Sequence, residues 1–369
     1  MIRALARVNL AAIERNCARF ASAAAPAALC AVVKADGYGH GAVPAGRVAQ
    51  AGGAAWLAVA TAVEAAELRA AGIAGPLLVL GALSPEELDV SLRAGADVAC
   101  WRVATAEAIA RRAGELGVEP GVHVKLDTGM GRLGTRDADE ATATAAAVAA
   151  APGVRLAGIF THFATADEDD PAFLREQLAA FTAWADKMRA RHDGMVVHAA
   201  NSAATLAEPA ARLDMVRCGV GIYGLDPFQR DPAEQGLEPA LELRSYLAEV
   251  KPCAKGESAG YGRRFVAERD TWLGTIPIGY GDGYRRALTN NAEVVVDGRR
   301  FPVVGAVSMD NITVDLGAAP PGAGATVTLI GDGLRAEELA ARLGTINYEI
   351  TCGISRRVPR QHHRDGEPA

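Results

Sequence analysis

The sequence predicts an α/β fold in which an N-terminal (β/α)8 barrel is followed by a C-terminal, mostly-β domain. Short apolar runs of strand length alternate with helix-like segments through the first part of the chain, a pattern typical of parallel strands joined by helices. There are eight such runs, the number that a closed barrel of this type requires. From about residue 235 the pattern changes to strands separated by turns. With 369 residues the chain is too long for one small core, so we expect domains at 1–235 and 236–369.

The expected barrel strands are separated by segments rich in Ala, Glu, Leu and Arg. They cover Ala28–Val33, Trp56–Ala60, Leu77–Leu80, Asp97–Trp101, Val122–Leu126, Leu156–Thr161, Val196–Ala199 and Met215–Val216. One intervening helix has a clear start, because Ser84 can cap it, Pro85 suits its first turn and Glu87 can complete a capping box. A long periodic helix is expected over Pro171–Arg191.

The C-terminal domain is expected to consist mostly of strands, with one helix. Val294–Phe301 is predicted to form a hairpin, since Asp297-Gly298 is a turn sequence between two strand-like runs. The acidic, proline-bearing stretch Asp226–Gly236 is the expected link between the domains. Further strands are predicted at Leu243–Val250, Trp272–Pro277, Val303–Val307, Ile312–Val314 and Thr326–Ile330, and a helix at Ala336–Leu343 precedes a last apolar run.

The composition of the chain argues against some classes of binding partner and some cellular locations. A formal net charge of −6 argues against nucleic acid, because phosphate backbones are bound by clustered Lys and Arg. Apolar runs are too short for a transmembrane helix, and the N-terminus lacks the apolar stretch of a signal peptide, so we expect a cytoplasmic protein. The six cysteines form no CxxC pair and are interpreted as free, mostly buried thiols; a disulfide or a metal site is the alternative.

Polar residues gather where the predicted barrel strands end. Barrel enzymes assemble their active sites at the carboxyl ends of the strands, so this clustering predicts a site. The residues in question are Lys34, Lys125, Asp127, Arg132, His162, Asn201, Ser202 and Arg217.

Most of these residues also have a purely structural interpretation. Lys34 alone would be an ordinary surface lysine, and Lys125 could pair with Asp127. His162 could be a hydrogen-bonded core histidine. Asn201 and Ser202 could only cap a helix, and Arg217 could be a structural ion-pair partner.

Considered together, the residues favour a cofactor site. The run Ala31–Gly41 places Lys34 among glycines, a tyrosine and a histidine, and a lysine with a lowered pKa can form an imine with an aldehyde. The Gly219-Val220-Gly221 backbone and the Ser202 hydroxyl suit a phosphate group. A lysine beside a phosphate site is the minimum expected for pyridoxal 5'-phosphate.

The sequence motifs resemble those of the bacterial alanine racemases, which depend on pyridoxal phosphate. The resemblance covers essentially the whole chain and implies a barrel followed by a β domain. Its matching segments are AVVKADGYGHG at 31–41, VKLDTGMGRLG at 124–134, THFATAD at 161–167, NSAAT at 201–205, VRCGVGIYG at 216–224, SAGYG at 258–262, IGYGDGY at 278–284, VGAVSMDN at 304–311 and TINYEI at 345–350.

The resemblance implies a two-base mechanism. Lys34 would hold the cofactor and exchange the α-proton on one face of the substrate, and Tyr261 of a second subunit would act on the other face. Two groups are needed, because a single one tends to return the proton to the face it left. Tyrosines titrate at about pH 10, so such a base needs cationic or hydrogen-bonding neighbours, for which His162 and Arg217 are the family's candidates.

The family also implies roles for the remaining residues. Arg217 would face the pyridine nitrogen of the cofactor, and Arg132 would lie near the substrate carboxylate. Lys125 would be carbamylated and orient Arg132, with an ordinary pair between Lys125 and Asp127 as the alternative. The cofactor phosphate would be bound by Tyr38, Ser202, Gly219, Val220 and Tyr348, with Asn201 supporting this site; Met309, at the substrate carboxylate, and Asp310 would come from the partner subunit.

The implied protein is a homodimer with composite active sites that supplies D-alanine for peptidoglycan. A racemase of the same fold acting on serine, or on a broader set of amino acids, is the main alternative, because one methylene or hydroxyl contributes only about 1–3 kcal/mol of discrimination. A fold-related decarboxylase is disfavoured by Arg217, and a non-catalytic carrier of the cofactor is disfavoured by the β domain. The sequence departs from the family pattern at Cys218, often Pro, and at Ala306, commonly Arg.

Overall fold

The computed structural model describes residues 2–369 and divides the chain into two compact units. One unit, the barrel unit, holds Ile13–Ile222. The other, the β unit, combines Tyr223–Ala369 with the described residues up to Ala12. The N-terminal segment therefore lies outside the barrel, in contrast to the expected 1–235 domain. Strand β1 (Leu5–Asn9) pairs with β10 (Leu241–Tyr246) and β19 (Arg360–Arg364), partners that no local pattern in the first residues identifies.

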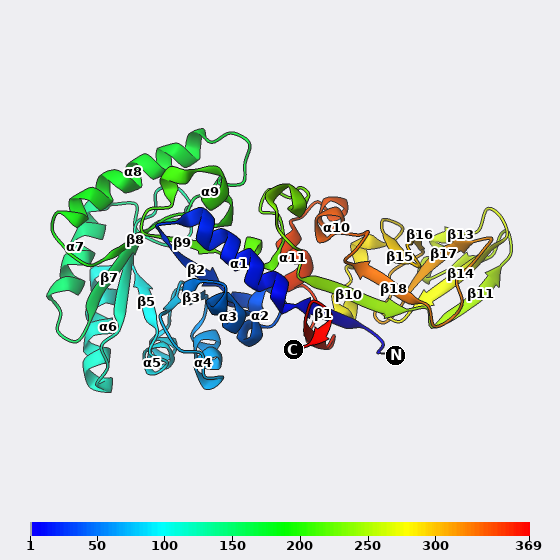
Figure 1. Ribbon diagram of the computed structural model, residues 1–369, viewed down its shortest axis with the longest axis horizontal. Helices are drawn as coiled ribbons and strands as arrows, with labels where there is room; N and C mark the ends of the chain where they lie inside the picture. Colours follow the sequence, from blue (N-terminus) through cyan, green and yellow to red (C-terminus); the bar gives the residue numbers. More distant parts are fainter. Residues whose placement is uncertain (1) are drawn as a thin grey trace. The chain divides into compact units, whose positions relative to one another are not determined.

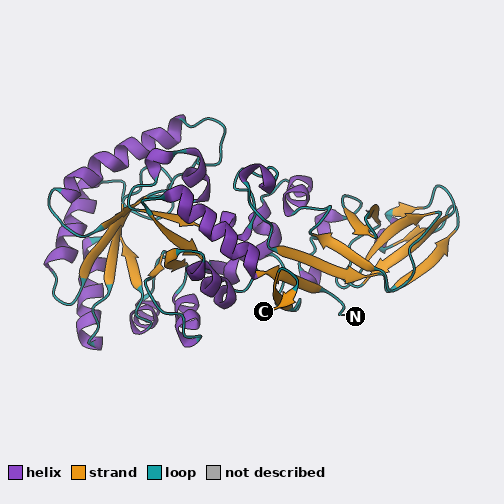
Figure 2. Cartoon of the chain, in the orientation of Figure 1, coloured by secondary structure: helices purple, strands orange, loops and turns teal. Residues whose placement is uncertain are grey.

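The barrel unit is built on a closed sheet of eight parallel strands, which confirms all eight predicted strands (Figures 1 and 2). The first and last strands close the barrel, with Ala28 opposite Met215. The strands are β2 (Ala28–Val32), β3 (Ala54–Val59), β4 (Leu77–Val79), β5 (Asp97–Cys100), β6 (Gly121–Lys125), β7 (Arg155–Phe160), β8 (Val196–His198) and β9 (Met215–Cys218).

Helices surround these strands, as Figure 2 shows. The predicted capping box is present, because the Ser84 hydroxyl accepts from the Glu87 N–H at 3.2 Å and the Glu87 carboxylate accepts from the Ser84 N–H at 2.9 Å. The helices are α1 (Leu10–Ala24), α2 (Lys34–Tyr38), α3 (Ala42–Ala51), α4 (Ala62–Ala70), α5 (Pro85–Arg93), α6 (Val103–Leu116), α7 (Ala138–Ala150), α8 (Ala172–Arg189) and α9 (Ser202–Ala207).

The β unit contains a ten-stranded sheet in the order β11-β14-β17-β16-β15-β18-β10-β1-β19-β20. The predicted hairpin is confirmed, with Asp297 and Gly298 at φ 48° and 73° between β15 and β16, as a tight hairpin turn requires. Beyond β1, β10 and β19, the strands are β11 (Glu249–Cys253), β14 (Thr271–Ile276), β15 (Glu293–Val296), β16 (Arg299–Val304), β17 (Ile312–Gly317), β18 (Thr326–Ile330) and β20 (Glu367–Pro368), and a separate pair is formed by β12 (Ser258–Ala259) and β13 (Phe265–Val266).

Two strand predictions in this unit are wrong. Leu243–Val250 is not one strand, because the chain leaves β10 after Tyr246 and enters β11 at Glu249, which pairs with β14 instead. Val303–Val307 is not a separate strand either, since its first two residues end β16. The helix α10 (Ala336–Leu343) has the predicted bounds, and a second helix, α11 (Asn347–Cys352), follows it.

No helix within the described residues is long and apolar enough to cross a membrane. The same residues contain no group of three or more His, Cys, Asp or Glu side chains that could hold a metal ion.

Candidate active site

Lys34 lies in an unusual turn directly after β2. The strand ends at Val32, and four successive residues from Ala35 to Tyr38 have φ between 52° and 59°. Left-handed backbone costs about 1–2 kcal/mol per non-glycine residue, and such strain is retained where the surrounding structure fixes it, often at functional sites. The turn leaves Lys34 half-buried, with its Nζ 6.0 Å from the centre of the Tyr38 ring.

Three side chains hold this turn. The Glu64 carboxylate accepts from the Ala35 N–H at 2.7 Å and from the Ala60 N–H at 2.8 Å. The Asp36 carboxylate accepts from the Ala42 N–H at 3.0 Å. The buried His40 ring places Nδ1 3.0 Å from the carbonyl oxygens of both Gly37 and Tyr38, so this nitrogen carries the proton. The position of Lys34 is therefore set by groups around it.

Four of the five residues predicted to bind a phosphate come together in the barrel unit, and the fifth, Tyr348, belongs to the β unit. The buried Ser202 hydroxyl accepts from the N–H groups of Gly219 and Gly221 at 3.0 and 3.4 Å. A Cβ at Gly219 would lie 2.3 Å from the Tyr38 Oη, so only glycine allows this close approach. Val220 is buried beside them. Clustered backbone N–H groups and hydroxyls of this kind form anion-binding sites.

Asn201 has the structural role that was considered for it. Its side-chain oxygen accepts from the Ala204 N–H at 2.9 Å and caps α9. The cap fixes the start of the helix and thereby the position of Ser202.

Arg217 is buried inside the barrel on β9. Its guanidinium donates to His198 Nδ1 at 2.8 Å, to the Thr161 and Ala199 carbonyls at 2.8 and 3.0 Å, and contacts His162 Nδ1 at 3.2 Å. No carboxylate within the described residues forms an ion pair with it. Burial lowers the pKa of Arg217 to about 10, which leaves it a cation at neutral pH.

The pKa of His162 is lowered by its burial and by the positive charges around it. Burial lowers its pKa well below the usual value, and the charges of Arg217, Arg132, Lys125 and Lys34 lower it further. Arg217 contacts this neutral imidazole, and the other three sequence-predicted cations lie close enough to act on it electrostatically. This concentration of positive charge at the carboxyl ends of the barrel strands fits an anionic ligand.

Lys125 is buried on the last position of β6, over the Phe160 ring at 5.4 Å. Burial, together with the charges of Arg217 and Arg132, lowers its pKa to about 8. The pair with Asp127, one of the two alternatives for Lys125, does not form within the described residues. Instead, Asp127 accepts from Arg136 Nε at 3.1 Å and from the Gly129 and Gly131 N–H groups, which shapes the loop after β6.

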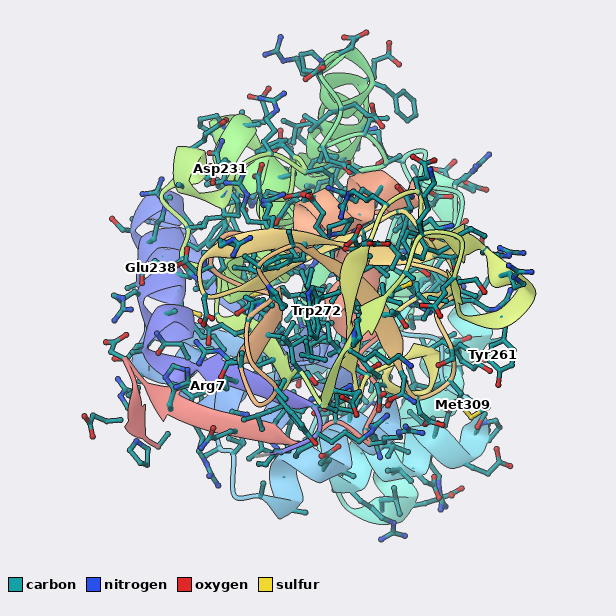
Figure 3. All side chains as sticks on the ribbon, turned by 90° about the vertical axis from the view of Figure 1, so that its right-hand side faces the viewer. Arg7, Asp231, Glu238, Tyr261, Trp272 and Met309 are labelled. Atoms are coloured by element: carbon teal, nitrogen blue, oxygen red, sulfur yellow. The ribbon has the colours of Figure 1, made fainter. Side chains whose placement is uncertain are left out.

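Two of the candidates in the β unit have exposed side chains. Tyr261 is 76% exposed and Met309 is 51% exposed, and both side chains project from the ribbon in Figure 3. Their loops are adjacent, since a Cβ at Gly260 would lie 3.0 Å from the Ala306 nitrogen. Tyr348 is half-buried on α11.

A buried carboxylate supports the loop that carries Met309. Asp282 accepts two hydrogen bonds from Arg3, at 2.7 and 2.8 Å, and one from Arg357 at 2.8 Å. Its turn donates to this loop, with the Gly281 N–H bound to the Met309 carbonyl at 2.9 Å. Asp310 also pairs with Arg357. Sequence reasoning missed Asp282, although its position inside IGYGDGY was a signal.

The fold is that of a barrel enzyme, and the candidate active site is a cationic cluster at the carboxyl ends of the parallel strands. Two family models match almost the whole chain: the alanine racemase N-terminal domain over residues 8–227 and the alanine racemase C-terminal domain over residues 240–362. The chain belongs to the alanine racemase family.

Individual relatives agree with this assignment. The chain is 42% identical over 359 residues to the alanine racemase of Desulfovibrio desulfuricans, covering 96% of each sequence. It resembles the crystal structure of alanine racemase from a D-cycloserine-producing Streptomyces lavendulae at 38% identity, with a TM-score of 0.93 over 98% of this chain and 97% of that one. The biosynthetic alanine racemase of Pseudomonas aeruginosa matches at 37% identity, with a TM-score of 0.90 over 99% and 100%.

Proposed function

We propose that the protein interconverts L-alanine and D-alanine with pyridoxal phosphate, as a homodimer in the cytoplasm that supplies D-alanine for peptidoglycan. The proposal depends on one observation: Lys34, Arg217 and the contact between Ser202 and the Gly219 N–H all lie in the same barrel unit. The chain that contains them belongs to the alanine racemase family. Membership of this family favours alanine over serine as the substrate.

The residues present fit pyridoxal phosphate. The N–H groups of Gly219 and Gly221 gather at the Ser202 hydroxyl, and the Tyr38 hydroxyl lies against Gly219. These donors suit a dianionic phosphate. Lys34, held in its left-handed turn, would bind the cofactor aldehyde covalently, and Tyr348 is a further phosphate donor implied by the family.

Pyridoxal phosphate, when bound, acts as an electron sink that acidifies the α-proton of an amino acid. Lys34 would remove or return that proton on one face of the substrate. Tyr261 of the partner subunit would do so on the other face, which makes inversion of the α-carbon possible. His162 and Arg217 supply the hydrogen-bonded, cationic surroundings that such a tyrosine needs to exist as an anion.

Arg217 restricts the chemistry. With a pKa of about 10 it remains protonated at neutral pH, so it donates hydrogen bonds and supplies no proton. A ring nitrogen facing Arg217 would stay unprotonated, whereas an acidic partner would protonate it. We infer that this weaker electron sink favours simple return of the α-proton over transamination.

The environment of Lys125 supports carbamylation. A pKa of about 8 gives a larger fraction of neutral amine at physiological pH than an exposed lysine has, and the neutral amine is the form that reacts with carbon dioxide. The product carries a negative charge beside Arg217 and Arg132, where the lysine cation is disfavoured. It would orient Arg132 toward the substrate carboxylate. Intact mass spectrometry in bicarbonate buffer, compared with a Lys125→Met variant, tests this role.

The exposure of Tyr261 and Met309 supports a composite site. A catalytic tyrosine needs a shielded, well-positioned environment, which the surface of its own unit does not provide. A twofold dimer in which each β unit completes the partner's site satisfies this requirement. Asp310 would act from the same loop by holding it through Arg357.

Mixed dimers test the composite site directly. Lys34→Ala and Tyr261→Phe chains carrying different affinity tags are co-expressed, and the heterodimer is isolated. Each parent should be nearly inactive. The heterodimer should recover about half of the wild-type activity, because one of its two sites then has both residues intact. No recovery would show that both residues serve the same chain's site.

Substrate breadth and direction need a separate assay. L-Ala, L-Ser, L-Lys and L-Glu are incubated with the enzyme in deuterated water, and α-deuterium is followed in both enantiomers. Alanine should exchange fastest. Tyr261→Phe should suppress α-proton exchange far more from one enantiomer of alanine than from the other. Small, equal losses in both directions would refute the assignment of this tyrosine as the second base.

A further inference from the structure

A row of buried polar side chains crosses the interior of the barrel. It consists of Arg217, His198, His123 and Asp97. The Arg217 guanidinium donates to His198 Nδ1 at 2.8 Å, and His198 Nε2 lies 2.9 Å from His123 Nδ1. His123 Nε2 in turn faces the Asp97 carboxylate at 3.5 Å, a contact longer than a normal hydrogen bond. The row links residues on β9, β8, β6 and β5.

The row has a single direction. An arginine can only donate, so His198 must leave Nδ1 unprotonated and carry its proton on Nε2. That proton points to His123 Nδ1, so His123 must also carry its proton on Nε2, toward Asp97. Burial lowers the pKa of both imidazoles, which keeps them neutral. The row therefore runs from a cation through two oriented dipoles to a carboxylate.

Glycines make room for this row. A Cβ at Gly121 would lie 2.3 Å from Asp97 Oδ2, and a Cβ at Gly158 would lie 2.4 Å from His123 Nδ1. Barrel interiors are usually filled by large branched side chains, whereas glycine within a strand marks a close approach. Phe160 stacks on His198 at 4.9 Å with the planes 2° apart.

The row reaches the opposite end of the barrel from Lys34. Asp97, Gly121 and Arg155 are each the first residue of a barrel strand. Asp97 is held by Arg155 at 2.9 Å and by the Gly121 N–H at 3.0 Å. It lines a cavity of about 370 Å³ together with Trp56 and Leu92. The carboxylate is thus anchored where the barrel meets solvent.

We propose that Asp97 and His123 are positioning residues for Arg217 and that they act on it through His198. The geometry supports this role because Arg217 is a buried cation without a carboxylate in contact, and Asp97 supplies a countercharge at the end of the row. The oriented imidazoles hold the guanidinium in one hydrogen-bonding arrangement. The catalytic part of this inference rests on the proposed function, in which Arg217 faces the cofactor.

Nitrogen NMR of the full-length protein with labelled histidine side chains tests the row without relying on activity. Both His123 and His198, assigned with His123→Asn and His198→Asn variants, should be neutral and protonated on Nε2. Asp97→Asn, which removes the charge but keeps the size, should shift the ring nitrogens of His198 as well as those of His123. A response confined to His123, or an Nδ1-protonated ring, would overturn the row.

Kinetics test the positioning role. By analogy with residues that orient metal ligands, Asp97→Asn should lower kcat about tenfold or more while KM changes by less than about twofold. The visible absorbance of the bound cofactor should shift as well. Asp214→Asn is the control, because Asp214 is more exposed than Asp97 but also accepts from one arginine and from one backbone N–H, at Val197, and no hydrogen bond or ion pair joins it to a histidine within the described residues.

The two measurements separate the possible failures. If Asp97→Asn shifts His198 but leaves both kcat and the absorbance unchanged, the row exists and its positioning role is refuted. If the same losses appear in Asp214→Asn, the effect is general destabilisation and the proposal fails. If the wild-type protein neither binds pyridoxal phosphate nor racemises alanine, the proposed function fails, while the NMR result still decides whether the row exists.

Discussion

Arg217 and Lys125 in the barrel unit and Asp282 in the β unit are buried charges that are balanced in different ways. The barrel unit buries two cations, Arg217 and Lys125, with no carboxylate in ion-pair contact within the described residues. The β unit buries a carboxylate, Asp282, between Arg3 and Arg357. A buried charge without a partner is costly, so the cations of the barrel reduce stability unless an anion arrives. We infer from this difference that Arg217 and Lys125 are placed for a ligand, whereas the charges around Asp282 stabilise the fold.

The largest effect is expected at Lys34, where the barrel unit would bind its ligand covalently. Lys34→Ala should remove covalent attachment of pyridoxal phosphate and lower racemisation by at least about 10²–10⁴-fold, the range for loss of an acid–base group. Borohydride reduction of the wild-type holoenzyme followed by peptide mass spectrometry should find the label on Lys34. Lys187→Ala, an exposed lysine of the same unit, is the control. A label on any other lysine would disprove the assignment.

The local part of the architecture could be predicted from the sequence. The eight barrel strands, the Ser84 cap and the Asp297-Gly298 turn depend on neighbouring residues, so their patterns are visible in the chain. The pairing of β1 with β10 and β19 joins segments more than 200 residues apart, and nothing near Leu5 specifies it. The break between β10 and β11 is missed for the same reason, because the change of partner decides it.

In the candidate site, too, local features could be predicted from the sequence and long-range contacts could not. Lys34, Ser202 and Arg217 stand at strand ends and could be recognised there, but the left-handed turn after β2 could not, because Ala35 and Asp36 rarely adopt such backbone. The row through His123 and His198 depends on contacts between strands far apart in sequence. Only the closed barrel brings these side chains together.

The second-largest effect is expected in the β unit. Asp282→Asn should lower the free energy of unfolding by about 3 kcal/mol, the lower end of the range for breaking a buried ion pair. Asp310→Asn is the control, since Asp310 is half exposed and binds the same two arginines, and it should cost less than about 1 kcal/mol. Denaturant titrations of both variants check this, and equal losses would contradict the distinction between the buried and the exposed carboxylate.

The pH dependence of the Asp282 contribution has a definite sign. Burial alone would raise the pKa of this carboxyl, but the hydrogen bonds from Arg3 and Gly279 and the charge of Arg357 hold it below its usual value. Its stabilising contribution is therefore complete above the range in which unfolded carboxyl groups titrate, and it is lost as the pH falls through the folded-state pKa. Asp282→Asn should remove this part of the acid sensitivity.

The charge of buried Lys125 is expected to destabilise the fold, in contrast to the charge of Asp282. Its pKa is about 8 in the folded barrel and 10.5 for an ordinary lysine, so the unfolded chain binds more protons between these values. With the cofactor removed and Lys125 kept unmodified in buffer free of bicarbonate, the free energy of unfolding should rise with pH across this window, by up to about 3 kcal/mol for the full shift. Lys125→Met should flatten the rise and Lys187→Met should not. A slope that is unchanged in Lys125→Met would show that Lys125 is not the group responsible.

The smallest effect is expected at Ser202, where we propose that the barrel unit binds the cofactor phosphate. Ser202→Ala removes one hydroxyl and leaves the N–H groups of Gly219 and Gly221 able to bind phosphate, so affinity for pyridoxal phosphate should fall by about tenfold. Fluorescence titration of the cofactor-free protein measures this loss. Ser91→Ala is the matched control, because Ser91 is also buried in the barrel unit and its hydroxyl has no hydrogen-bond partner among the described residues. Stability should change little in Ser202→Ala, because the hydroxyl organises a ligand site and contributes little to the fold. A large loss of stability with unchanged cofactor affinity would contradict this interpretation. Ser202 would then have a structural role, as Asp282 does.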